Sequence, residues 1–85
     1  MLSPAQVMFR EAWGAVADRR DLELSPVEGG FAHLESRTLI LLSSSDLEAQ
    51  ARDYGWTVRR VDRALELTAL AADLRRRMER ERGAA

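Results

Sequence analysis

The sequence predicts a small mixed α+β fold that is mostly α-helical. An amphipathic pattern opens the chain, short apolar runs broken by proline and glycine follow, and residues 57–82 contain neither proline nor glycine. A chain of 85 residues is one domain with a thin hydrophobic core. Within the single domain 1–85 we expect an N-terminal helix in residues 1–20, a strand and turn region in 21–45, two helices joined by a turn in 46–67, and a C-terminal helix extension over 68–82.

The N-terminal helix is indicated by its cap and by its apolar face. Ser3 is a candidate N-cap, Pro4 suits the first helical position, and Gln6 completes a capping box. The helix should end near Arg19 and Arg20, where cations interact favourably with the helix dipole. The apolar residues that recur on one face are Ala5, Phe9, Ala12, Trp13 and Val16.

The region from 21 to 45 predicts one or two short strands. Pro26, Gly29 and Gly30 interrupt any helix, and residues 38–42 form a β-branched, leucine-rich run. A second apolar segment covers residues 31–34, and turns are expected at 28–30 and 35–37. His33 is interpreted as a strand or surface histidine, because the sequence offers it no partners for a metal or catalytic site.

The next segment has the signals of a helix, a turn and a second helix. Ser45 and Glu48 form a second possible capping box before a helix that should run from 46 to about 54. Gly55 can adopt the left-handed conformation that ends a helix. Thr57 is a suitable N-cap for a following helix, which could continue as one long helix to residue 82.

Residues 46–67 resemble helix-turn-helix DNA-binding domains. Such a pair needs a small residue in the first helix, a glycine at the turn and an aliphatic residue in the second helix, and Ala51, Gly55 and Val61 stand at the spacing of these motifs. The expected order of helix, strand, helix and helix is similar to that of winged-helix proteins. This resemblance implies a second helix that inserts into the major groove of DNA.

A cluster of arginines would lie on the exposed side of that second helix. On a helical wheel these residues project opposite Val58, Val61 and Leu65, as in a recognition helix. Asp62 and Glu66 leave open the alternative of a solvated face held by ion pairs. The predicted DNA-contacting residues are Thr57, Arg59, Arg60 and Arg63.

Further along, leucines replace arginines on the same side of the predicted helix. The helix would then carry two apolar faces, and a second subunit is the economical cover for one of them. A homodimer is therefore expected, the alternative being a monomer whose last helix is buried in its own core. The predicted interface residues are Leu67, Leu70, Leu74 and Met78.

Composition restricts the function classes. The net charge is -1, which argues against a broad electrostatic grip on nucleic acid, although all 13 cationic residues are arginines. Cysteine is absent and His33 is the one histidine, so neither disulfides nor metal or other cofactors are expected. The N-terminus lacks the pattern of a signal peptide and no apolar run is long enough to cross a membrane, so a cytoplasmic location is expected.

Two functions remain in competition. The first is a small dimeric helix-turn-helix protein that binds duplex DNA as a transcriptional regulator or accessory factor. The second is a protein–protein interaction or oligomerisation module, in which the long C-terminal helix assembles an oligomer or docks on a larger protein partner. An enzyme is not expected, because the sequence lacks a nucleophile motif, a phosphate loop and a second histidine. Arginines gathered on one face would favour DNA, whereas arginines held against carboxylates would favour the interaction module.

Overall fold

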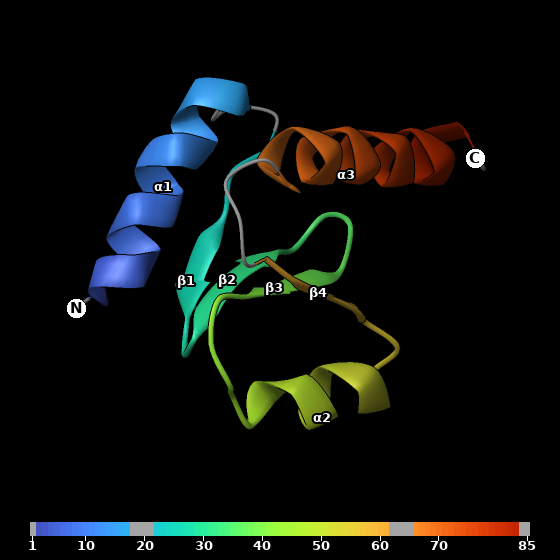
Figure 1. Ribbon diagram of the computed structural model, residues 1–85. Helices are drawn as coiled ribbons and strands as arrows, with labels where there is room; N and C mark the ends of the chain where they lie inside the picture. The colour runs from blue at the N-terminus through green and yellow to red at the C-terminus, as the bar shows by residue number, and fades with distance from the viewer. Residues whose placement is uncertain (1, 18–21, 62–65, 84–85) are drawn as a thin grey trace.

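The computed structural model describes residues 2–17, 22–61 and 66–83. It is a mixed α+β fold with a helix at each end, which confirms the predicted fold class. The elements are α1 (Pro4–Val16), β1 (Ser25–Val27), β2 (Gly30–His33), β3 (Thr38–Leu41), α2 (Leu47–Asp53), β4 (Thr57–Arg60) and α3 (Glu66–Gly83), as Figure 1 shows.

The four strands form one sheet in the order β1-β2-β3-β4. The first three are an antiparallel meander, and their turns lie where the sequence predicts them. Gly29 has a φ of 79° in the first turn, and Arg37 has a φ of 53° in the second. β4 pairs parallel with β3, and a parallel pair requires a crossover connection, which α2 supplies.

The sheet separates two unequal helical layers. Figure 1 shows α1 and α3 on one side of the sheet and α2 alone on the other. Side chains alternate between these sides along each strand. Phe31 and Ile40 belong to the core shared with α1 and α3, whereas Ala32 and Leu39 lie on the α2 side.

α1 begins as predicted, with its capping box formed. The Ser3 hydroxyl accepts from the Gln6 amide at 3.2 Å, and the Gln6 side chain accepts from the Ser3 amide at 2.8 Å. The helix ends at Val16, before the predicted end at Arg19 and Arg20, because Ala17 takes an extended conformation and enters the core. Ala5, expected on the apolar face, is exposed.

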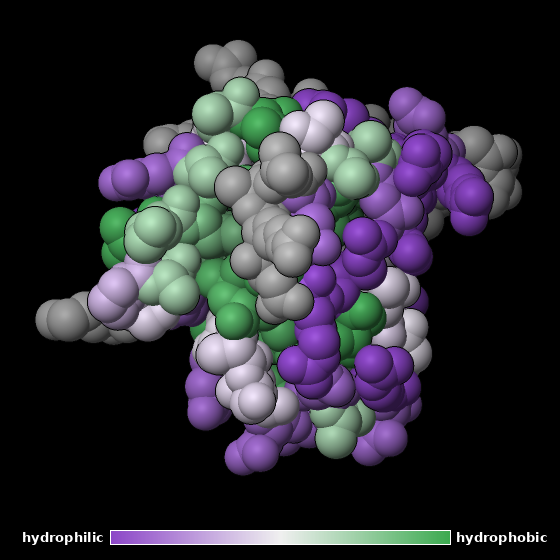
Figure 2. Space-filling model, viewed as in Figure 1, coloured by the Kyte–Doolittle hydropathy of each residue, from purple (hydrophilic) through white to green (hydrophobic). Residues whose placement is uncertain are grey.

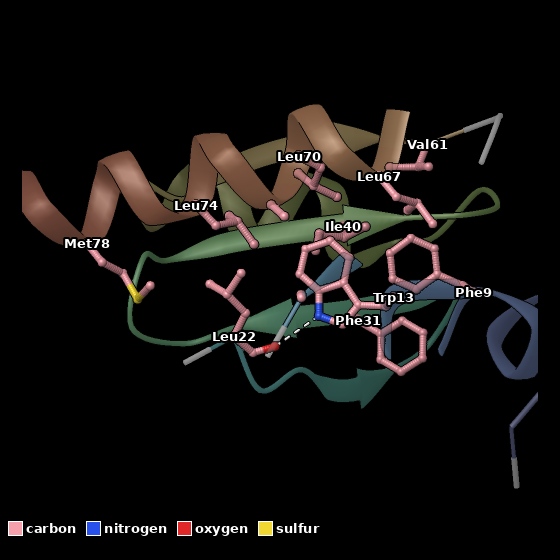
Figure 3. Close-up of a cluster of buried hydrophobic side chains, with 12 residues drawn as sticks. Phe9, Trp13, Leu22, Phe31, Ile40, Val61, Leu67, Leu70, Leu74 and Met78 are labelled. Carbon is pink, nitrogen blue, oxygen red and sulfur yellow. Dashed lines mark hydrogen bonds between the residues drawn. The ribbon is translucent and has the colours of Figure 1, made fainter. Parts of the chain in front are cut away.

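The core is built on aromatic side chains from α1, as predicted. The ring centroids of Phe9 and Trp13 lie 5.7 Å apart, and those of Phe9 and Phe31 lie 5.4 Å apart. The Trp13 indole donates to the Leu22 carbonyl at 3.0 Å, the dashed line in Figure 3. This bond satisfies the one polar group that Trp13 brings into an apolar environment.

The predicted helix that starts at Thr57 is wrong over its first residues, because residues 57–60 form strand β4. The same arginine pattern that reads as one face of a helix places Arg59 and Arg60 on opposite sides of a strand. Thr57 and Val58 are β-branched and suit a strand, and β4 gains a complete parallel pairing with β3. This tertiary pairing outweighs the helical propensity of the arginines. Val58, placed on the apolar side of the predicted helix, is only partly buried, and Leu65, placed on the same side, lies outside the described residues.

The second predicted capping box is also wrong. Asp46 is the N-cap residue of α2 and makes no side-chain cap bond, while the Ser45 hydroxyl accepts from the Leu47 amide at 3.2 Å. Glu48 is directed instead towards β4. Gly55 follows α2 with a φ of 79°, so the predicted left-handed residue at this turn is confirmed.

Candidate protein-interaction surface

Arg59 is held against α3 by a network of hydrogen bonds. Its guanidinium donates to the Asp73 carboxylate at 2.9 Å, and the Nε of Arg77 donates to the same oxygen at 3.1 Å. Arg77 also donates to the Thr57 hydroxyl at 3.0 Å. Arg76 lies 3.6 Å from the other carboxylate oxygen. The network fixes β4 to the middle of α3.

Asp73 is ionised more readily because of these partners. Burial by itself would raise its pKa, but the hydrogen bond from Arg77 and the charges of Arg77, Arg59 and Arg76 together hold the pKa below its usual value. The side chain is only 17% exposed, so the cations act in a partly desolvated site. The ionised Asp73 carboxylate therefore has a structural role, because it links α3 to β4.

Arg60 points to the other side of the sheet and pairs with α2. Its guanidinium donates to both oxygens of the Glu48 carboxylate, the second at 3.1 Å. Both bonds come from the Nη2 atom, and the arginine side chain is 57% exposed. Arg59 therefore pairs with α3 and Arg60 with α2. The two side chains do not project from the same surface.

The predicted DNA-contacting set is therefore not assembled as expected. Thr57, Arg59 and Arg60 lie on a strand and hold the adjacent helices, while Arg63 lies outside the described residues. Exposed cations on α3 include Arg75, Arg76 and Arg80, interspersed with Glu79. Figure 2 shows hydrophilic residues over the C-terminal end of this helix.

The residues predicted for a dimer interface are buried inside one chain. Leu70 and Leu74 have no exposed surface, and both lie against the α1 and sheet residues of the core (Figure 3). Leu67 and Met78 belong to the same cluster. The apolar face for which a second subunit was expected is covered within one chain by α1 and the sheet.

The side of the sheet that faces α2 carries an open apolar groove of about 310 Å³. Its floor comes from Val27 in β1, Ala32 in β2 and Leu39 in β3. Its walls come from the turn after β2 and from α2 with the residues that follow it. The wall residues are Leu34, Leu47, Gln50, Ala51, Tyr54 and Trp56.

Large apolar side chains at the groove remain accessible to solvent. Tyr54 is 81% exposed and Leu34 is 63% exposed. Tyr54 and Trp56 flank Gly55, which has a φ of 79°, and both line the groove. An exposed cluster of this kind, lined by aromatic and aliphatic residues, is typical of surfaces that bind other molecules.

Sequence reasoning missed this surface because it assigned Tyr54 and Trp56 to the turn between two helices. The available signal was two aromatic residues flanking a glycine, next to a helix that bears no strong apolar face. A strand at residues 57–60 must be known before that helix can be placed on the second face of the sheet.

A larger hollow of about 600 Å³ lies between α1 and the chain leading to β1. Its walls include Trp13 and Phe31 from the core, together with the charged Arg10 and Glu23. Leu22, one of its lining residues, follows directly in sequence on residues 18–21, which are outside the described residues, and no site is assigned to this hollow.

His33 is buried, which corrects the interpretation of a surface histidine and agrees with its place on a strand. Its Nδ1 lies 2.5 Å from the Ser36 hydroxyl, and the Ser36 hydroxyl bonds to that of Thr38 at 2.9 Å. All three side chains are buried beneath the turn between β2 and β3. The cluster satisfies the polar groups of the tight turn in which Arg37 has its positive φ.

No group of three or more potential metal ligands occurs within residues 2–17, 22–61 and 66–83. Across the same ranges, no helix combines the length and the apolar character needed to cross a bilayer. Neither a protein-family model nor a curated protein nor a solved structure matches the chain.

Proposed function

We propose that the protein is a non-enzymatic protein-interaction module that binds a partner protein through the α2 side of its sheet. The observation that carries the proposal is the apolar groove, at which Tyr54 and Leu34 are largely exposed. Aromatic residues that can be buried by a partner contribute strongly to protein–protein binding. The C-terminal helix expected to mediate assembly has its apolar face in the core, so the contact surface is a different one.

The arrangement of arginines that led to the prediction of DNA binding is not present among the described residues. The motivation was a recognition helix presenting Arg59 and Arg60 together, whereas these side chains hold Asp73 and Glu48 on opposite sides of a strand. Arginines paired with carboxylates are the arrangement expected of the interaction module. The low net charge points in the same direction.

The test uses a variant that removes apolar contact without adding charge. Leu34→Gln/Tyr54→Gln changes two exposed side chains of the groove and should leave the fold intact. The matched control is Val7→Gln/Met8→Gln, since these α1 residues are 42% and 71% exposed on another element. Circular dichroism and urea unfolding establish that each protein is folded.

Proteins retained by the immobilised native chain but not by the groove variant are identified, purified and titrated by calorimetry. A purified partner should bind the native chain and the α1 control equally, and the groove variant at least about tenfold more weakly. Random-sequence duplex DNA at low salt is titrated in parallel. Salt-dependent DNA binding with no protein partner would refute the proposal, as would a partner that binds both variants alike.

A further inference from the structure

α2 leaves much of its side of the sheet uncovered. The opposite side is covered by two long helices, whereas α2 has seven residues and packs mainly against β4 (Figure 1). The groove floor of Val27, Ala32 and Leu39 runs across β1, β2 and β3. The open strip therefore lies beside α2 and spans three strands.

The strip has the width of one helix. Three neighbouring strands span two inter-strand spacings, about 9–10 Å in total. An α-helix with its side chains measures about 10–12 Å across. We propose that one amphipathic α-helix of a partner protein docks in this strip beside α2, with basic residues flanking its apolar stripe. This inference rests on the proposed function and specifies the structure and charge of the bound segment.

The edge of the sheet does not favour an added strand as the occupant. β1 is the edge strand next to the groove and has only three residues. Its central residue is Pro26, which has no amide hydrogen to donate to a neighbouring strand. The apolar side chains of the groove floor stand out from the face of the sheet instead, where the apolar residues of a helix can reach them.

Acidic residues stand next in sequence to several groove residues and indicate the charge of the partner. These carboxylates outnumber the one cation in such a position, Arg52, although Glu48 is paired with Arg60 and lies 3.9 Å from Arg52. Arg37 is an exposed cation in the turn after β2. The carboxylates next to groove residues, apart from Glu48, are Glu28, Glu35, Asp46 and Asp53. A helix with lysine or arginine beside its apolar stripe is electrostatically complementary to this rim.

The length of α2 sets the length of the contact. Seven residues of helix extend about 10 Å, so a helix lying alongside α2 contacts it over about two turns. Apolar side chains at positions i, i+3 or i+4, and i+7 would face Ala32, Leu39 and the side of α2 that bears Ala51. Tyr54 and Trp56, which also line the groove, would contact that helix as well.

The experiment is a selection from a library of helices displayed on a stable three-helix scaffold, with the exposed positions of one helix randomised. The library is selected for binding to the full native chain and depleted on Leu34→Gln/Tyr54→Gln. We expect clones with apolar residues at helical spacing and a net positive charge. Each should lose at least about tenfold in affinity for the groove variant and none for Val7→Gln/Met8→Gln.

A second comparison tests the charge. Asp46→Asn/Asp53→Asn removes two carboxylates of the rim, and Glu11→Gln/Glu79→Gln removes two exposed carboxylates on α1 and α3. The selected helices should bind the rim variant roughly three- to tenfold more weakly, and this difference should shrink as salt rises. The second variant should bind as the native chain does.

The outcomes separate this inference from the proposed function. A selection that yields no groove-dependent helix, or yields only acidic ones, overturns the inference. A purified natural partner that binds the groove through an extended segment also overturns it, while the proposed function stands. If neither helices nor natural partners depend on the groove, both proposals fail.

Discussion

At the scale of single residues, Gln6 connects α1 to the sheet. Its side-chain nitrogen Nε2 donates to the Val27 carbonyl at 2.8 Å and to the Gly30 carbonyl at 2.9 Å. Its side-chain oxygen Oε1 accepts from the Ser3 backbone amide and completes the helix cap. The side chain is buried, so a lost donor is not replaced by water. One glutamine therefore positions the helix and the turn between β1 and β2.

Gln6→Glu should destabilise the protein while nearly preserving the size of the side chain. Two carbonyl acceptors would lose their donors and face a carboxylate, at a cost of about 2–4 kcal/mol. Urea unfolding at neutral pH measures the loss. Ser3→Ala, which removes only the cap, should cost about 1 kcal/mol, and equal losses for the two variants would show that the bonds to the sheet contribute nothing.

The leucines of α3 give a second prediction at this scale. Leu70→Ala should lower the free energy of unfolding by about 2–5 kcal/mol, because Leu70 is completely buried in the core of its own chain. The loss should be the same at low and high protein concentration. If the residue instead formed a dimer interface, the stability of the native protein would rise with concentration.

At the scale of elements, the contact between β4 and α3 depends on one carboxylate. The pKa of Asp73 is lower in the folded protein than in the unfolded chain, so its ionised form stabilises the fold. That contribution is complete above the unfolded value of about 3.9 and is lost as the pH falls through the folded-state pKa.

Asp73→Asn should therefore be less stable than the native protein at pH 7, by about 1–3 kcal/mol, and the difference should narrow as the pH falls below about 4. Urea unfolding across this range measures both proteins. Asp53→Asn, an exposed carboxylate on α2, is the matched control and should follow the native curve. A constant difference between Asp73→Asn and the native protein at every pH would contradict the assignment.

The elements also show how far the sequence predicts the structure. Local signals were sufficient for the start of α1, for the turns of the meander and for the glycine after α2, because capping residues and glycines act on their immediate neighbours. They were insufficient for β4, which becomes a strand by pairing with β3, nineteen positions earlier in the chain at Thr38 and Thr57. The groove follows from that pairing, so it could not be predicted without it.

At the scale of the whole molecule, local stability should differ between the central strands of the sheet and α2. Every residue of β2 and β3 is buried, and each of these strands has a neighbour on both sides. α2 contains no buried residue. An element with few buried contacts opens locally at a lower free-energy cost than the core does.

Hydrogen exchange measured residue by residue should therefore be fastest in α2 among the helices and slowest in β2 and β3. Binding of a helix in the groove would bury Tyr54 and the side of α2 that carries Ala51, so exchange in α2 should slow in proportion to occupancy. Amides of α1, on the far side of the sheet, should keep their rates. Uniform slowing in every element would indicate that the ligand stabilises the fold as a whole, and amides of α2 that are as protected as those of β3 in the free protein would contradict the uneven distribution.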